Sequence, residues 1–254
     1  MSYYRKNQVF EMRTRVKILG VLVDQVDITT AVERINDFVD SKENKLIVTP
    51  NAEMIMEAQG DERLQRIINE ADLALPDGAG VVIASQILGQ AIPERIAGID
   101  IVQELFARGK QKEYSFYFLG GAPSVAQKAK ERVLASYSNL KINVHHGYLT
   151  RELEEQVIND IIKKSPDILL VGMGVPLQEK WLARYLDEFS DLVGMGVGGT
   201  FDILAGAKKR APQWMQQLYL EWFYRLVQEP QRIKRIIQLP KFMQQVLEQK
   251  HNNQ

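Results

Sequence analysis

Short β-rich runs alternate with longer amphipathic patterns between residue 16 and about residue 206, and this alternation constrains the fold more than any other feature. Strand-like runs occupy 16–23, 45–49, 73–75, 114–119, 141–145, 168–172 and 192–196. Helical periodicity occupies 29–39, 53–68, 125–136, 151–164 and 178–189. A repeated strand, helix, strand order is typical of a parallel sheet whose strands are joined by helical crossovers.

The strand-like runs also indicate that both faces of the sheet are covered. The run "DILLVGMG" at 167–174 is almost continuously apolar, as expected of a strand packed on both sides. We therefore expect an α/β fold with a Rossmann-like, mostly parallel sheet and helices on both faces. A chain of 254 residues, 45% of them hydrophobic and 25% charged, can bury the core that such a fold needs.

The alternation stops near Gly206, and only helical patterns follow, at 212–228, 230–238 and 240–249. Each of them begins with a proline, which suits the first turn of a helix. We expect residues 1–206 to form the α/β core and residues 207–254 to form a helical appendage. From Gly206 to Lys250 the chain has nine Lys or Arg against three Glu, a charge of +6 in a chain whose net charge is zero. This asymmetry favours an anionic partner: a membrane, a nucleic acid or a phosphate group.

The appendage also contains an aromatic segment, "WMQQLYLEWFY", at 214–224. Trp214, Leu218 and Trp222 recur every four residues and so would share one helical face. That face can pack on the core, or it can lie on lipid, where Trp and Tyr favour the interface and nearby basic residues attract anionic head groups. The sequence alone leaves both alternatives open.

Two strand-to-helix loops contain candidate catalytic residues, because ligands of an open parallel sheet bind beyond the carboxyl ends of its strands. In "VTPNAEM", Thr49 or Asn51 can cap the following helix or line a binding site. In "LPDGAG", Asp77 can cap a helix, or it can act as a general base beside glycines that allow a ligand close to the backbone.

Three further loops are rich in glycine. Gly120 and Gly121 in "FLGGAP" can offer free N–H groups to a phosphate at a helix N-terminus. Gln178 in "GMGVPLQE" and Asp202 in "VGGTFD" can hydrogen-bond a sugar or a base. Tight packing of strand ends is the alternative explanation for both of the latter loops.

Several function classes lack their usual signals. The chain has no cysteine, no Asp-x-Asp pair and no Gly-x-Ser-x-Gly elbow, and His145 and His146 are adjacent and read as a strand end. A nicotinamide-dependent oxidoreductase remains an alternative, although G-x-G-x-x-G is missing. A nucleic-acid-binding module is disfavoured by the acidic remainder of the chain, so we expect no nucleic-acid partner.

Taken together and in order, these loops resemble the WecG/TagA/CpsF family of glycosyltransferases. The resemblance extends from about residue 16 to residue 235. The segments that carry it are "VTPNAEM", "LPDGAGVV", "RIAGID", "FLGGAP", "DILLVGMGVPLQEKW", "VGGTFDILAG" and "KRAPQWMQQLYLEWFYRLVQEPQRIKR".

The resemblance implies an inverting transfer of a sugar from a UDP-sugar to a sugar on polyprenyl diphosphate, with no cofactor and no metal. The teichoic-acid branch is the most similar. It implies transfer of N-acetylmannosamine to the 4-hydroxyl of lipid-linked N-acetylglucosamine, with an N-acetylmannosaminuronic acid or glucosyl donor as the alternative. A cytoplasmic protein, peripheral on the inner face of the cell membrane, is implied. The aromatic segment suggests self-association away from the membrane.

The resemblance also implies roles for individual residues. Asp77 is expected to be the general base that takes the proton of the acceptor hydroxyl. The residues expected to hold the donor sugar or the acceptor are Thr49, Asn51, Arg95, Gln178 and Asp202. The residues expected near UDP are Gly120, Gly121 and Tyr148. The arginines expected to meet diphosphate and to form part of a lid are Arg225, Arg232 and Arg235. One position departs from the family: Leu177 stands where a Lys or Arg is common, so a charge near the nucleotide is either missing or supplied from elsewhere.

Overall fold

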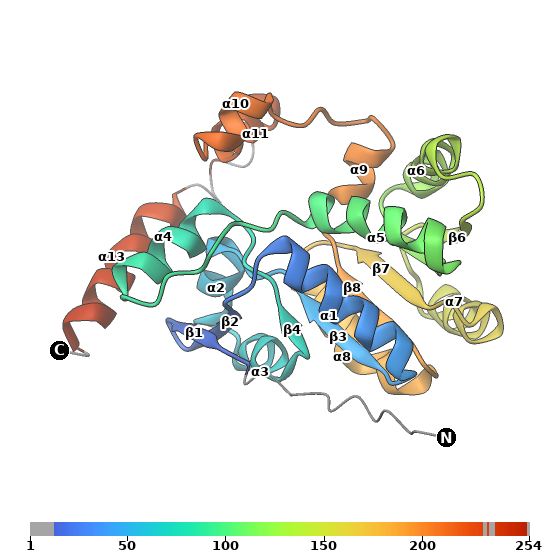
Figure 1. Ribbon diagram of the computed structural model, residues 1–254, viewed down its shortest axis with the longest axis horizontal. Helices are drawn as coiled ribbons and strands as arrows, with labels where there is room; N and C mark the ends of the chain where they lie inside the picture. Colours follow the sequence, from blue (N-terminus) through green and yellow to red (C-terminus); the bar gives the residue numbers. More distant parts are fainter. Residues whose placement is uncertain (1–12, 231–232, 234–236, 253–254) are drawn as a thin grey trace, which may run out of the picture.

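A six-stranded, wholly parallel sheet forms the centre of the molecule, in the order β4-β3-β8-β7-β5-β6 (Figure 1). The structure is a computed structural model, and it describes residues 13–230, 233 and 237–252. The strands are β3 (Lys45–Val48), β4 (Leu73–Ala74), β5 (Ser115–Gly120), β6 (Lys141–His145), β7 (Ile168–Gly172) and β8 (Val193–Gly196). The expected α/β fold is therefore confirmed.

Helices cover both faces of the sheet, and the sheet separates the hydrophobic core into two clusters. Along β3, Leu46 and Val48 pack into one hydrophobic cluster and Ile47 packs into the other, as the two-residue period of a strand dictates. One face carries α1 (Ile28–Ser41), α5 (Gly98–Lys112), α6 (Pro123–Ser136) and α9 (Thr200–Leu204). The other carries α2 (Ala52–Ala58), α3 (Glu62–Glu70), α4 (Ala79–Ile87), α7 (Arg151–Lys164) and α8 (Leu177–Tyr185), which the 3₁₀ turn Leu186–Glu188 extends.

Two of the elements expected before residue 206 are each divided into two. The run 16–23 is an antiparallel hairpin, β1 (Arg15–Ile18) and β2 (Val21–Asp24), because Leu19 and Gly20 turn the chain with positive φ angles of 46° and 82°. The pattern 53–68 breaks at Gly60, after which the side chain of Asp61 accepts a hydrogen bond from the N–H of Leu64 and begins α3. The expectation of a single strand and a single helix in these segments was wrong, because turn and cap residues interrupted the periodic pattern.

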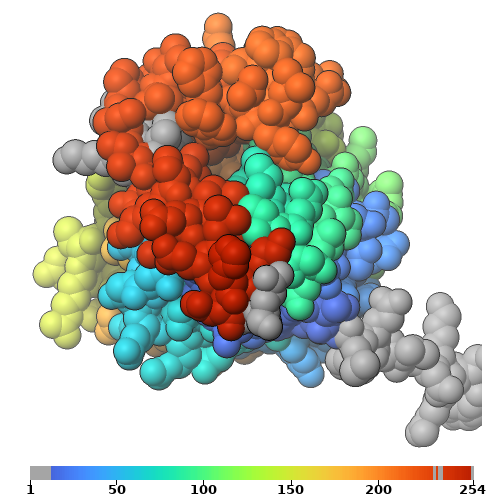
Figure 2. All heavy atoms as spheres, turned by 90° about the vertical axis from the view of Figure 1, so that its left-hand side faces the viewer, coloured from blue at the N-terminus to red at the C-terminus, as the bar shows by residue number. Residues whose placement is uncertain are grey.

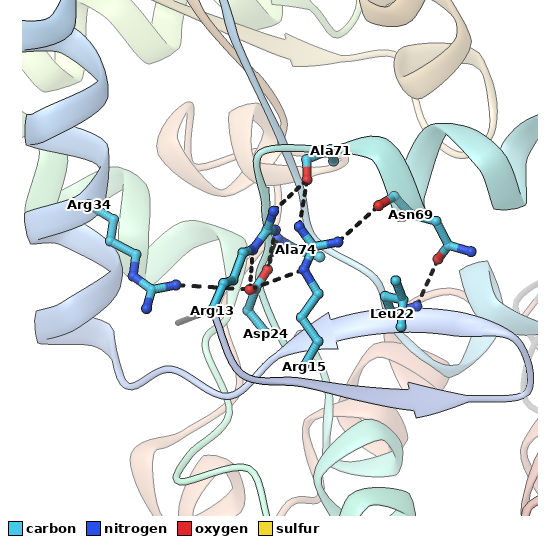
Figure 3. Close-up of polar contacts among 8 residues, drawn as sticks. All are labelled: Arg13, Arg15, Leu22, Asp24, Arg34, Asn69, Ala71 and Ala74. Carbon is cyan, nitrogen blue, oxygen red and sulfur yellow. Dashed lines mark hydrogen bonds and ion pairs between the residues drawn. The ribbon is translucent and has the colours of Figure 1, made fainter. Parts of the chain in front are cut away.

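The hairpin is joined to edge strand β4 through a buried carboxylate, that of Asp24 (Figure 3). Its Oδ2 accepts hydrogen bonds from the N–H of Ala74, at 2.7 Å, and from Nη2 of Arg13, at 2.5 Å. Guanidinium nitrogens of Arg15 and Arg34 lie 3.5 and 3.9 Å from Oδ1. One fully buried negative charge thus holds three arginines beside the edge strand.

We expect Asp24→Asn to destabilise the protein by about 3–5 kcal/mol, because removing one partner of a buried ion cluster leaves the remaining charges uncompensated. Urea denaturation measures this loss. The matched control is Asp37→Asn, on the exposed side of α1, which we expect to change the free energy of unfolding by less than about 0.5 kcal/mol. Equal stabilities of the two variants would contradict the role given to Asp24.

The described helices that follow residue 206 occupy two different places. Helices α10 (Gln213–Gln217) and α11 (Glu221–Gln228) stand above the carboxyl edge of the sheet, whereas α13 (Gln238–Asn252) lies along α4 and α2 (Figures 1 and 2). Phe242 and Val246 of α13 are fully buried in the core. The expected continuous helix 212–228 is broken, because Tyr219 has a φ of 60°, which ends α10.

Candidate active site

A cavity of about 440 Å³ opens at the carboxyl ends of four strands. Its walls are the loops that follow β3, β4, β7 and β8, together with α11 and the segment that joins α9 to it. Strands β3 and β8 are neighbours, but the helices after them, α2 and α9, pack on opposite faces of the sheet. Chain that diverges in this way leaves a crevice between two strand ends, the usual ligand site of an open α/β sheet.

Thr49 and Asn51 lie side by side in one wall of this cavity. The side chain of Asn51 caps α2 by accepting a hydrogen bond of 2.9 Å from the N–H of Met54. The buried hydroxyl of Thr49 donates a 3.3 Å hydrogen bond to the carbonyl of Gly196 on β8. Thr49 therefore links the end of β3 to β8 at the crevice, while Asn51 begins the helix beside it.

Asp77 lines the same cavity, from the loop between β4 and α4. Its N–H donates to the carbonyl of Pro50, which ties this loop to the loop after β3. Gly78 follows with a φ of 86°, a conformation that favours glycine. Burial raises the pKa of Asp77 to about 6; Arg225 and Arg95 oppose the rise. A carboxyl group with a pKa near neutrality is suited to accept a proton during a reaction.

Gln178 joins the glycine-rich loop after β7 to the glycine-rich loop after β8. Its Oε1 accepts hydrogen bonds from the N–H groups of Gly174, at 3.2 Å, and Gly198, at 3.0 Å. Its Nε2 donates to Oε1 of Glu179, at 2.7 Å. Both side chains are buried, and Oε2 of Glu179 has no hydrogen-bond partner within the described residues. Gln178 lines the cavity, as expected, and its amide is fixed by the loops that it connects.

We expect Glu179 to make the protein less stable as pH rises through the range 4.5 to 7. Burial raises the pKa of Glu179 to about 7, above its ordinary value of 4.5. The folded protein then holds a proton that the unfolded chain releases, so raising pH costs stability, by about 3 kcal/mol over this window. Urea denaturation at pH 5 and pH 8 measures the change. Glu179→Gln should reduce this change to the smaller part that Asp77 contributes, because burial also raises the pKa of Asp77, to about 6. The control Glu248→Gln, on an exposed side of α13, should keep the whole change.

A second, smaller cavity of about 170 Å³ adjoins the first. It is lined by Arg95, by Tyr219 and Trp222 of the C-terminal segment, and by Leu239 of α13. Four residues line both cavities: Asn51, Glu53, Asp77 and Arg225. Asp77 therefore stands at the junction of two pockets, one large and one small.

Basic side chains from the segment after α9 line the large cavity. They are Lys208, Lys209 and Arg210. The exposed Leu177 does not line it. Positive charge at the large cavity is therefore contributed by this segment and not by position 177. The segment is tied to the core, because both terminal nitrogens of Arg210 contact the carboxylate of Asp100 at 2.5 and 2.6 Å.

Asp202 does not line either cavity of the described residues. Its carboxylate is 3.0 Å from Nζ of Lys208, which also contacts Glu229 at 2.6 Å. This ion-paired bridge connects α9 to the residue that ends α11. Asp202 thus lies outside both cavities and pairs with Lys208, which lines the large one.

Three further expected residues do not line either cavity of the described chain: Gly120, Gly121 and Tyr148. Gly120 ends β5, Gly121 follows it, and Tyr148 lies after β6. Strands β5 and β6 lie beyond β7, at the opposite edge of the sheet from β4. The N–H of Gly121 donates to the carbonyl of Gly172, at 3.1 Å, so it is already engaged. Arg232 and Arg235 lie outside the described residues, and of the three expected arginines only Arg225 is located in the structure.

Within residues 13–230, 233 and 237–252, no three His, Asp or Glu side chains gather closely enough to hold a metal ion. The ring of His145 lies against that of His146, at 4.4 Å between centroids.

Across the same residues, none of the helices has the length and apolar character needed to span a bilayer.

Sequence reasoning missed Glu221, a buried carboxylate in the wall of the small cavity. It contacts Arg95 at 3.0 Å and Arg225 at 2.6 Å. The spacing of four residues between Glu221 and Arg225 was a visible signal of a helical ion pair. Its contact with Arg95, 126 positions earlier in the chain, had no local signal.

Comparison with known proteins gives a family for these features. Residues 16–254 match the model of the glycosyl transferase WecG/TagA/CpsF family. A protein of Staphylococcus aureus (strain MW2), named N-acetylglucosaminyldiphosphoundecaprenol N-acetyl-beta-D-mannosaminyltransferase, is 36% identical over 238 residues, 93% of each chain. Proteins of the same name from S. aureus strains NCTC 8325 / PS 47 and MRSA252 have the same identity and coverage.

Proposed function

The chain belongs to the WecG/TagA/CpsF family of glycosyltransferases, and from this we propose that it transfers N-acetylmannosamine from UDP to the 4-hydroxyl of N-acetylglucosamine on undecaprenyl diphosphate. Such a product is the linkage unit of wall teichoic acid. The names of the relatives, which are similar over 93% of the chain, support this donor and this acceptor.

The position of Asp77 between two cavities is the observation that carries the proposal. A transfer between two sugars needs both of them at one base. The large cavity has room for the UDP-sugar and contains the lysines and arginines that suit a diphosphate. The small cavity has the aromatic side chains of Tyr219 and Trp222, which suit the ring of the acceptor sugar.

The reaction then follows from this arrangement. The acceptor hydroxyl oxygen attacks the anomeric carbon from the side of the small cavity, while its proton passes to the carboxylate of Asp77. The bond between the anomeric carbon and the UDP oxygen breaks, and UDP leaves with the electron pair into the large cavity. Because attack and departure occur on opposite sides, the anomeric configuration inverts.

Charge on the departing UDP must be neutralised. Arg225 lines both cavities, and Lys208 and Arg210 line the large one, so we assign this role to basic side chains, in a reaction without a metal or other cofactor. Of the helices after residue 206, α10 and α11 would act as the lid that completes the site.

The same lid exposes large apolar side chains that line neither cavity: Trp214, Leu218, Phe223 and Val227. Tyr219 and Trp222 are also partly exposed, where they line the small cavity. This exposure supports contact with lipid over packing on the core, the two alternatives that the sequence left open. The protein would act at the inner face of the cell membrane, where basic residues meet anionic head groups; away from the membrane this surface would favour self-association.

A panel of radiolabelled UDP-sugars, each with a short-chain polyprenyl diphosphate–N-acetylglucosamine acceptor, tests the proposal. We expect transfer from UDP-N-acetylmannosamine. Transfer only from the uronic acid or a glucosyl donor would assign another surface polysaccharide. Thermal protection by NAD and none by UDP would instead indicate an oxidoreductase.

A further inference from the structure

The buried carboxylate of Glu221 links two arginines that come from different parts of the fold. Glu221 is the first residue of α11 and is 5% exposed. Its Oε2 lies 3.0 Å from Nη1 of Arg95, in the loop before α5, and its Oε1 lies 2.6 Å from Nη2 of Arg225, one helical turn later. Each carboxylate oxygen therefore holds one guanidinium group.

A carboxylate in this position must be strongly paired, because removing it from water is costly. Burial acts to raise the pKa of Glu221, but the charges of Arg225 and Arg95 outweigh it and hold the pKa below its ordinary value. Glu221 is therefore ionised at neutral pH. The three side chains together have a net charge of +1, and all three line the small cavity beside Asp77.

We propose that Glu221 is a positioning residue, which orients the guanidinium groups of Arg95 and Arg225 toward a diphosphate in the small cavity. The geometry allows this, because each arginine gives one terminal nitrogen to Glu221, and a guanidinium group has five N–H donors in a fixed plane. The remaining donors can then meet phosphate oxygens. The inference rests on the proposed function, in which the acceptor sugar carries that diphosphate.

Glu221 also affects the base. The charges of Arg225 and Arg95 lower the pKa of Asp77, whereas the charge of Glu221 raises it. Without Glu221, the two arginines would act on Asp77 with no negative charge between them. Asp77 would then lose its proton at lower pH and become a weaker base. A residue that only fastened α11 to the core would not produce this change.

Glu221→Gln tests the proposal, with Glu248→Gln as the exposed control. We expect Glu221→Gln to raise the KM for the acceptor by about 10- to 100-fold, because two charge-assisted contacts lose their orientation. The affinity for UDP should fall much less, because Lys208, Lys209 and Arg210 still line the large cavity. The acid limb of the kcat/KM profile should move to lower pH. Glu221→Asp keeps the charge, so it should raise the acceptor KM but leave the acid limb in place.

An acceptor KM and an acid limb that both match the control would overturn the proposal, as would an equal loss of UDP and acceptor affinity. If Glu221→Gln fails to fold, Glu221→Asp decides by the acceptor KM. A calorimetric titration of inorganic pyrophosphate in saturating UDP separates this inference from the proposed function. Weaker pyrophosphate binding by Glu221→Gln supports the inference even if no UDP-sugar is transferred, and equal binding contradicts it.

Discussion

Asp77→Asn is expected to lower the rate of sugar transfer by roughly 10²- to 10⁴-fold, the contribution typical of a general base. The amide keeps the shape of the side chain but cannot take a proton from the acceptor hydroxyl. UDP affinity should stay unchanged, since the lysines and arginines of the large cavity are untouched. Single-turnover transfer of labelled N-acetylmannosamine, together with UDP titration, measures the two effects separately.

The same variant should be more stable than the unaltered protein. The folded-state pKa of Asp77 is raised from 3.8 to about 6, so ionisation above pH 6 costs up to about 3 kcal/mol of folding free energy. Asn avoids that cost, and its unfolding midpoint at pH 7 should rise. In the unaltered protein, kcat/KM should increase with pH through about 6, as the base becomes ionised. Transfer at the normal rate in Asp77→Asn would remove Asp77 as the base; Asp37→Asn serves as the matched control.

Phe242→Ala is expected to cost about 3–5 kcal/mol of stability, as buried aromatic side chains do when truncated. Phe242 is fully buried in the core cluster that contains α2 and α4. A Cβ atom added at Gly80 of α4 would lie 3.7 Å from the ring of Phe242, so the two helices pack closely at this point. Urea denaturation measures the loss.

Leu247→Ala on the same helix is the matched control, because Leu247 is 48% exposed and its loss should cost less than about 1 kcal/mol. The difference between the two stability losses tests whether α13 belongs to the core or to the lid. If residues 207–254 were a single detachable unit, both substitutions would leave the core equally stable. We expect instead that removing α13 destabilises the core, whereas removing residues 207–229 alone leaves it folded and impairs transfer.

Local patterns in the sequence predicted the parallel sheet well. Ile47 faces one core cluster while Leu46 and Val48 face the other, so the strands carry apolar residues on both sides. The loops that follow them also had readable chemistry. Asn51 is the helix cap that its position indicated, and Asp77 lies in a cavity at the strand ends. These features depend on neighbours in the sequence and on the general geometry of parallel sheets.

Features that depend on distant contacts were not predictable in this way. The order of the strands placed β5 and β6 away from the cavity, and with them Gly120, Gly121 and Tyr148. Asp202 was expected to contact the substrate, but its carboxylate pairs with Lys208, which is also held by Glu229 at the end of α11. The segment around Phe242 has the sequence pattern of an appended helix, and only its tertiary packing shows that Phe242 belongs to the core.

The most direct test of the account is one distance, measured in a crystal structure with a non-transferable UDP-N-acetylmannosamine analogue and a short-chain acceptor. We predict that the acceptor 4-hydroxyl oxygen lies about 2.6–3.2 Å from a carboxylate oxygen of Asp77, with the donor in the large cavity and the acceptor sugar in the small one. An acceptor hydroxyl bound away from Asp77, or both sugars in the large cavity, would contradict it.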